Sequence, residues 1–301
     1  KAVLKPYGCD VQICYTCAGG PRAARLVSKK TIATAPRNPS FPDLPTPKGP
    51  IDFGATGVEF LQWAYLGIND FAKDHGESEK QLRAIANIQD PSYYIVAVKT
   101  GSGITDLRQI VENRLPAKMV AKMLGGEITP MVMEYYGISK ERLVSFGGTF
   151  DEDRVGDSAR DKDKDVDVLI GWGAPVNAPE YAIWNRASQK FDLQFLELPP
   201  DLRAKLIKQF HLEERKIPPG LFRGIDKPIP TVARNGDVVY GRTDMPEEFA
   251  YTLAKALDEH QELLMWTHMN WSYNWRTVWK TLDVPLHPGA ARYYKERGYM
   301  K

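Results

Sequence analysis

The stretch that most constrains the fold spans residues 165–177 and reads DVDVLIGWGAPVN. Its apolar run at 166–170 is β-branched or bulky, which predicts a strand buried in a sheet. The glycines on either side of Trp172 are expected to break that strand, and a helical pattern opens at Pro179. In α/β proteins ligands bind at such strand–turn–helix junctions, outside the carboxyl ends of the strands. We therefore expect a ligand-facing edge here; the alternative is a tight connection with a core tryptophan.

Strand and helix patterns alternate along the rest of the chain, which predicts the α/β class with mainly parallel sheets. Strands are expected at residues 11–14, 51–54, 82–88, 93–98, 119–123, 191–196, 230–233 and 238–240, and helices at 22–27, 200–210 and 244–265. The Asn-Gly-Asp sequence at 235–237 predicts a hairpin turn between the last two strands. Residues 31–50 carry six prolines and are expected to form an extended surface loop.

Composition bounds the class of protein. A chain of 301 residues with 43% hydrophobic and 26% charged residues is ordinary for a globular protein and long enough for two domains. The net charge of +2 favours neither nucleic acid nor a membrane surface, and aromatic residues are not interleaved with a basic patch. No apolar run approaches the ~20 residues of a membrane-spanning helix. We expect any targeting segment to have been cleaved or omitted from this chain.

Motifs of common catalytic and nucleotide sites are absent from the sequence, which contains no HExxH, GxSxG, P-loop or GxGxxG. The five histidines fall in polar, aromatic-rich or proline-flanked contexts, where structural roles are expected. The charged stretch at 151–165 is expected to be a solvated loop or helix end. We therefore expect no catalytic residue, no bound metal and no cofactor.

The cysteines are Cys9, Cys14 and Cys17, and the last two form a CxxC. No second Cys/His pair at zinc spacing accompanies them, and a redox CxxC would open a helix directly after a strand. Small buried residues or one disulfide remain as alternatives. If the strand at 11–14 continues through Tyr15, Cys14 and Cys17 point to opposite faces. We expect neither zinc nor a catalytic dithiol.

Glycine turns recur at four places, each after a strand and before a helix: Gly19-Gly20, Gly54 with Gly57, Gly125-Gly126, and Gly171 with Gly173. Together they could aim several helix N-termini at one small anion. A cleft of that kind without catalytic groups is a binding site. The ligand-lining residues expected from this pattern are Gly19, Gly20, Arg22, Thr56, Gly125, Trp172 and Gly173, with Phe222 at the edge.

The position of Arg22 leads us to expect an anionic ligand. A cation in the first turn of a helix is unfavourable for the helix dipole alone, so an anion at that N-terminus would account for it. The alternative is that Arg22 reaches an acidic side chain on the surface. Trp172 would cover the apolar part of the ligand, which favours an organic acid over an inorganic anion.

Several segments in order resemble one family of transport receptors. The C-terminal VPLHPGAARYYKERGY (284–299), the DVDVLIGWGAP stretch, and IPPGLFRG (217–224) followed by IPTVA (229–233) are similar to TAXI-type solute receptors. These are the substrate-binding subunits of tripartite ATP-independent periplasmic (TRAP) transporters. AGG at 18–20, IDFG at 51–54 and LRAIA at 82–86 resemble the first-lobe ligand loops and strand of that family. The resemblance covers most of the chain.

The resemblance implies a two-lobed α/β fold of the periplasmic-binding-protein type (type II), with two crossover strands as the hinge. Lobe 1 would comprise residues 1–98 and 230–301, lobe 2 residues 99–229, and the crossovers would lie at 98–102 and 224–230. The protein would be periplasmic, bind a small organic acid or an amino-acid-like ligand between the lobes, and present the closed form to TRAP permease subunits. No nucleic-acid partner is implied.

A second hypothesis comes from another class of protein. The same two-lobed frame could belong to an enzyme that acts on a small anionic substrate, with Cys17 or His287 as the reactive group. A receptor should be stabilised by its ligand without turning it over, whereas an enzyme should consume it.

Overall fold

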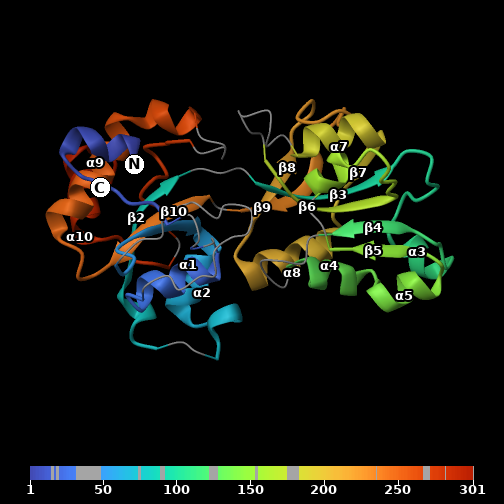
Figure 1. The fold of residues 1–301 in the computed structure, drawn as a ribbon, viewed down its shortest axis with the longest axis horizontal. Helices are drawn as coiled ribbons and strands as arrows, with labels where there is room; N and C mark the ends of the chain where they lie inside the picture. Colours follow the sequence, from blue (N-terminus) through green and yellow to red (C-terminus); the bar gives the residue numbers. More distant parts are fainter. Residues whose placement is uncertain are drawn as a thin grey trace. The chain divides into compact units, whose positions relative to one another are not determined.

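The computed structural model describes residues 1–14, 17, 20–31, 49–73, 76–88, 92–121, 128–152, 155–174, 183–234, 236–266, 272–281 and 283–300 (Figure 1). The chain forms two compact units. Unit 1 comprises Lys1–Asp90 and Asn235–Lys301, and unit 2 comprises Pro91–Arg234. Both combine a sheet with helices, so the predicted α/β class is confirmed.

Unit 1 is built on a three-stranded sheet in the order β1-β10-β2, with both pairs antiparallel. The strands are β1 (Gly54–Gly57), β2 (Leu82–Ile88) and β10 (Asp237–Arg242). The helices are α1 (Pro21–Ser28), α2 (Val58–Leu66), α9 (Glu247–Glu259) and α10 (Pro288–Glu296), with 3₁₀ segments at Ala2–Tyr7, Asn69–Phe71, Glu79–Gln81 and Gln261–Trp266. α10 packs closely on α9, and Tyr294 of α10 donates a hydrogen bond from its hydroxyl to Ile85 O of β2 at 2.9 Å.

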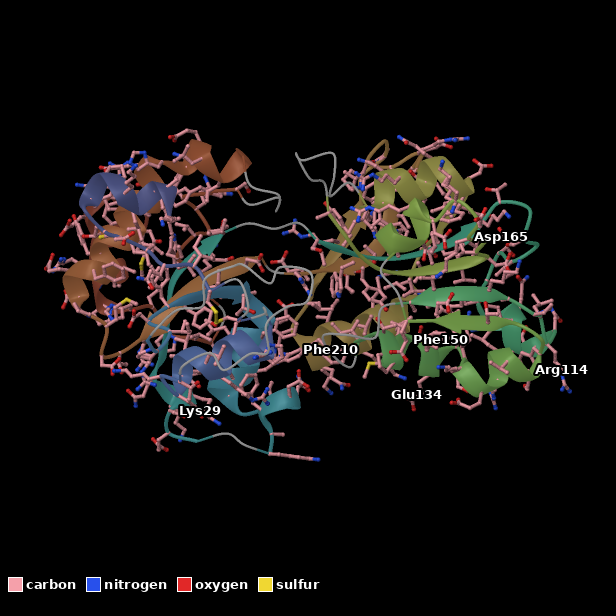
Figure 2. The ribbon with its side chains drawn as sticks, viewed as in Figure 1. Lys29, Arg114, Glu134, Phe150, Asp165 and Phe210 are labelled. Atoms are coloured by element: carbon pink, nitrogen blue, oxygen red, sulfur yellow. A yellow bond between two sulfur atoms is a disulfide. The ribbon has the colours of Figure 1, made fainter. Side chains whose placement is uncertain are left out.

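Unit 2 is built on a seven-stranded sheet in the order β5-β4-β6-β3-β9-β8, with β7 paired to β3. The strands are β3 (Tyr93–Lys99), β4 (Lys118–Ala121), β5 (Thr149–Asp151), β6 (Val168–Gly173), β7 (Leu193–Leu196), β8 (Glu213–Ile217) and β9 (Ile229–Ala233). The helices are α3 (Arg108–Glu112), α4 (Ile128–Tyr135), α5 (Lys140–Ser145), α6 (Val155–Arg160), α7 (Ile183–Phe191) and α8 (Pro200–Phe210). Phe210, labelled in Figure 2, ends α8 with a fully buried side chain.

Three expectations about the strands are wrong. The sheets are not mainly parallel, because β3 pairs antiparallel with β6, β7 and β9, and only the β4–β5 and β4–β6 pairs are parallel in the described sheets. The turn at 235–237 does not form a hairpin, because β9 and β10 belong to different sheets. Residues 11–14 form no strand. Local alternation of polar and apolar residues predicts that a strand forms but carries no information on its partner.

The sequence patterns predict neither β5 nor β8. β8 reads EERKI, and only its last residue is buried. It pairs with β9 along its whole length and lies at the end of the sheet order. Charged side chains are common on such edge strands, because they prevent pairing with other chains.

The segments through which the chain enters and leaves unit 2 lie side by side. Arg234 donates its backbone N–H to Ser92 O at 3.0 Å, and Tyr93 is the register partner of Ala233. The lobe boundaries expected after residue 98 and before residue 230 fall at the end of β3 and at the start of β9, and both strands belong to the unit 2 sheet. Residues 98–102 and 224–230 therefore lie within unit 2.

Candidate functional site

An aromatic and cationic cluster lies in unit 2 at the carboxyl ends of β6 and β9. Trp172 is the second-last residue of β6 and is paired in register with Tyr94 of β3. Their rings meet edge to face, with centroids 5.2 Å apart. The guanidinium carbon of Arg234 lies 4.7 Å from the centroid of the Trp172 ring. Because Trp172 and Arg234 are both half-buried, part of this stacked pair remains open to solvent.

Hydrogen bonds from two other elements hold the base of this cluster. The Tyr94 hydroxyl donates to Thr129 Oγ1 of α4 at 2.9 Å, and the Thr231 hydroxyl of β9 donates to the backbone carbonyl of Tyr94. All three side chains are buried, and burial raises the pKa of Tyr94 well above its usual value. Trp172 thus rests on a buried tyrosine that α4 and β9 both anchor.

The glycines around Trp172 do not end the strand, contrary to the sequence expectation, since β6 continues through Gly173. A Cβ atom on Gly173 would lie 2.8 Å from Trp184 Nε1 and closer still to Ile95 Cδ1. Trp184, which is buried, donates its indole N–H to Trp172 O at 2.9 Å. The close approach that requires a glycine here is therefore that of a core tryptophan. Ligand contact by Gly173 stays a prediction.

Phe222, expected at the edge of the ligand site, belongs to the hydrophobic core of unit 2. Its side chain is 4% exposed, and its ring stacks on Phe195 with centroids 6.1 Å apart and lies 6.4 Å from the ring of Trp184. These contacts explain an aromatic residue at this position by core packing alone, and ligand contact by Phe222 stays a prediction.

The sequence-predicted residues of unit 1 gather near the first turns of α1 and α2. Gly20 precedes α1 with φ +67°, and a Cβ there would lie 3.7 Å from the Phe60 ring in the first turn of α2. Arg22 is exposed in the first turn of α1, and no ion pair of its side chain is found among the described residues. Thr56 is buried in β1, and its hydroxyl has no hydrogen-bond partner in the described part of the chain. Gly19 and Gly125 lie outside the described residues.

A separate cavity of about 920 Å³ lies within unit 1. Its wall is mainly apolar and includes Leu4, Leu26, Phe53, Phe249, Leu253 and Leu257. Three of the charged groups on the wall pair with one another: Lys30 Nζ lies 2.6 Å from an Asp244 carboxylate oxygen, and Arg242 Nε lies 3.3 Å from the other. No predicted site residue within the described segments lines this cavity.

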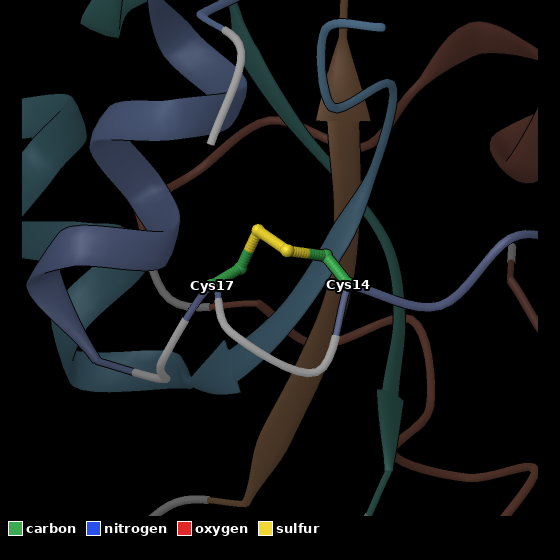
Figure 3. Close-up of a disulfide and its surroundings, with 2 residues drawn as sticks. All are labelled: Cys14 and Cys17. Carbon is green, nitrogen blue, oxygen red and sulfur yellow. A yellow bond between two sulfur atoms is a disulfide. The ribbon is translucent and has the colours of Figure 1, made fainter. Parts of the chain in front are cut away.

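The Cys14–Cys17 pair forms a disulfide on the wall of the cavity (Figure 3). The expectation that the two side chains point to opposite faces is wrong, because no strand forms at 11–14 to impose that alternation. Cys9 carries a free thiol and is half-buried. No group of three or more potential metal ligands is found in the part of the chain that the structure describes.

The two residues that the enzyme hypothesis needs have other roles. Cys17 is consumed in the disulfide. His287 is 1% exposed and caps α10, where its Nδ1 accepts a hydrogen bond from Gly289 N at 3.3 Å. Burial lowers the pKa of His287, which favours the neutral ring that accepts this bond.

Sequence reasoning found Trp172 but missed Arg234. The Asn-Gly-Asp sequence predicts a hairpin turn in the segment ARNGD, and that prediction overlooks the cation directly after the buried strand IPTVA. A charged residue at the carboxyl end of a buried strand is the signal that could have identified it. None of the helices in the described segments is long and apolar enough to span a membrane.

Several solved structures show remote similarity to the chain. Iron-bound HitA from Pseudomonas aeruginosa aligns with a TM-score of 0.42 and 12% identity, covering 99% of this chain and 93% of that one. The arginine-, lysine- and histidine-binding protein ArtJ from Geobacillus stearothermophilus aligns with a TM-score of 0.37 and 13% identity, over 88% and 79%. XAC2383 from Xanthomonas citri, bound to chloride, gives 0.37 and 13%, over 82% and 75%. These similarities are too remote to bear on the ligand.

The family model that matches the chain spans residues 46–298 and describes the NMT1-like family. The solute-binding class expected from the sequence is confirmed at this level, whereas the TAXI-type subtype and its TRAP permease stay predictions. The chain belongs to the NMT1-like family, whose members are solute-binding proteins of the periplasmic type.

Proposed function

We propose that the protein is an extracytoplasmic receptor that captures a small organic anion between its two units and delivers it to a TRAP-type membrane permease. The observation that carries this proposal is the half-buried Arg234–Trp172 pair at the carboxyl ends of β6 and β9. A cation and an aromatic face at that edge of an α/β sheet suit an anion with a carbon skeleton. The TAXI resemblance supplies the transporter class.

The connection between the units supports ligand-driven closure. On the side of unit 2, the two chain segments that connect the units are hydrogen-bonded to each other at Ser92 and Arg234. On the side of unit 1, they continue into β2 and β10, which are paired at Ile88 and Asp237. The connecting segments between these two pairs are therefore only a few residues long. Short paired connections are typical of hinges, and a ligand that contacts both units would shift the population toward the closed form.

The chemistry of the described residues favours binding over catalysis. The cluster around Trp172 offers a cation, an indole and hydroxyls that already bond to one another, but no nucleophile with an adjacent base. The family match agrees with this interpretation.

A thermal-shift screen of organic acids, amino acids and aromatic acids tests the proposal. A ligand that binds the folded state at a hundred times its Kd should stabilise it by about 2.7 kcal/mol, which raises Tm by several degrees. Each stabilising compound is then incubated with the protein and quantified by mass spectrometry. Stabilisation without consumption supports a receptor; consumption would instead support an enzyme of the second hypothesis.

A further inference from the structure

We infer that Arg234 is the carboxylate-binding residue of this receptor and that Trp172 positions it, so that the preferred ligand is an organic acid with a flat apolar body. The inference rests on the proposed receptor function and names the chemistry of its ligand. It concerns residues of unit 2 only.

The stacking geometry prepares the guanidinium for a planar anion. With its carbon 4.7 Å from the centroid of the Trp172 ring, the Arg234 group lies over the indole. Stacking of this type restrains the long arginine side chain, so less rotational entropy is lost when a ligand binds. The N–H edge of a guanidinium matches the two oxygens of a carboxylate and forms a bidentate pair.

The indole itself is held in place from two sides. The edge of Trp172 packs on the buried Tyr94, whose hydroxyl is fixed by Thr129. Its backbone carbonyl accepts the hydrogen bond of the core residue Trp184. A rigid support beneath a half-buried stacked pair is the arrangement that a preorganised binding site requires.

The surroundings favour an organic acid over an inorganic anion. Beside the guanidinium lies aromatic surface from Trp172, which would remain in contact with water if only phosphate or sulfate bound. An apolar ring attached to the carboxylate covers that surface and adds stacking energy. The contribution of the carboxylate and that of the planar body can therefore be measured separately, with ligands that carry only one of the two.

Arg234 also couples this site to the connection between the units. It is the last residue of unit 2, and its backbone N–H is bonded to Ser92 on the other connecting segment. A ligand that immobilises the Arg234 side chain would therefore act at the point where the two connections meet.

Calorimetry with benzoate, phenylacetate and indole-3-acetate as probes tests the inference, with benzamide as the neutral analogue of benzoate and inorganic phosphate as the simple anion. We expect the intact chain to bind at least one of the three carboxylates, to bind benzamide at least tenfold more weakly than benzoate, and to bind phosphate more weakly than the best carboxylate. Arg234→Ala should weaken carboxylate binding by about tenfold to a hundredfold and remove the discrimination against benzamide. Arg234→Lys keeps the charge without the planar fork and should give an intermediate loss.

Two further variants separate a binding role from a structural one. Trp172→Phe keeps an aromatic ring beside Tyr94 and should reduce carboxylate affinity several-fold without a change in Tm. Arg223→Ala removes another cation of unit 2, which pairs with Asp192 at 3.2 Å on the surface, and should leave affinity unchanged. Unchanged carboxylate affinity in folded Arg234→Lys and Arg234→Ala would overturn the inference. So would a screen in which other organic anions bind and no carboxylate does, although the proposed receptor function would then stand; binding of neutral solutes alone would overturn both.

Discussion

Replacement of Gly173 by alanine should destabilise unit 2 substantially, because the site of a new methyl group is already occupied. A Cβ on Gly173 would lie closer than 3.0 Å to both Ile95 and Trp184, whereas ordinary contacts lie at 3.4–4 Å. Trp184 cannot move away easily: it is 2% exposed, donates a hydrogen bond to Trp172 O, and packs against the Phe195 ring at 6.0 Å.

The size of the effect follows from the cost of overpacking. Inserting one methyl group into a well-packed core typically costs about 1–3 kcal/mol. Since two buried side chains face the same Cβ, we expect about 3 kcal/mol for Gly173→Ala. For a unit of roughly 150 residues this corresponds to a fall in Tm of roughly 6–12 °C.

The same strand provides a matched control. A Cβ on Gly171 would meet only Val155 Cγ2 at 3.7 Å, an ordinary contact. Gly171→Ala should therefore leave stability unchanged or raise it by up to about 1 kcal/mol, because alanine has less conformational freedom in the unfolded chain. Urea unfolding monitored by tryptophan fluorescence measures both variants. Equal stability of the two variants would refute the packing role of Gly173.

Three other outcomes are expected. Burial alone would raise the pKa of Glu79, but hydrogen bonds from two serine hydroxyls and a backbone N–H lower it below 4.5. The ionised carboxylate therefore stabilises the fold fully above that pH, and this stabilisation is lost as the pH falls through the lower pKa of the folded state. Glu79→Gln should flatten this acid-side loss of stability in urea unfolding, and an unchanged pH profile would contradict the assignment. Without reductant, a thiol reagent should titrate only Cys9 in the denatured chain, and a count of three would exclude the Cys14–Cys17 bridge. Gly289→Ala should cost about 1–3 kcal/mol, since its Cβ would lie under 3.0 Å from the backbone of α9, and a variant as stable as wild type would show that α10 can shift.

Elements with strong local signals could be predicted from the sequence. The helix expected at 200–210 matches α8, which opens with proline and has buried residues four positions apart. The strand expected at 82–88 matches β2, which reads LRAIANI and is mainly apolar. In both, the residues that define the element are neighbours in the sequence.

Pairing and long-range placement could not be predicted in the same way. The short sequence between β9 and β10 favours a hairpin turn, yet the two strands join different sheets. β9 pairs with β8 and with the distant β3, whereas β10 pairs with β1 and β2, so the outcome depends on strands far away in the chain. Local turn preferences are worth too little free energy to decide that pairing.

The candidate site was predicted in part for the same reason. Trp172 stands out because it follows a buried strand, and its place at the carboxyl end of β6 agrees with that pattern. Arg234 lies 62 positions further along the chain, and only the β3–β6 and β3–β9 pairings bring it to the indole. No local spacing links the two residues.

Hydrogen exchange with and without the best carboxylate from the calorimetric series tests the central claim most directly. If the ligand is enclosed between the two units, a saturating carboxylate at one molecule per chain should slow exchange at the end of β6 and at the first turn of α2 together. Protection should follow the same binding curve in both segments. Protection confined to one unit, or its absence at saturation, would contradict capture between the units.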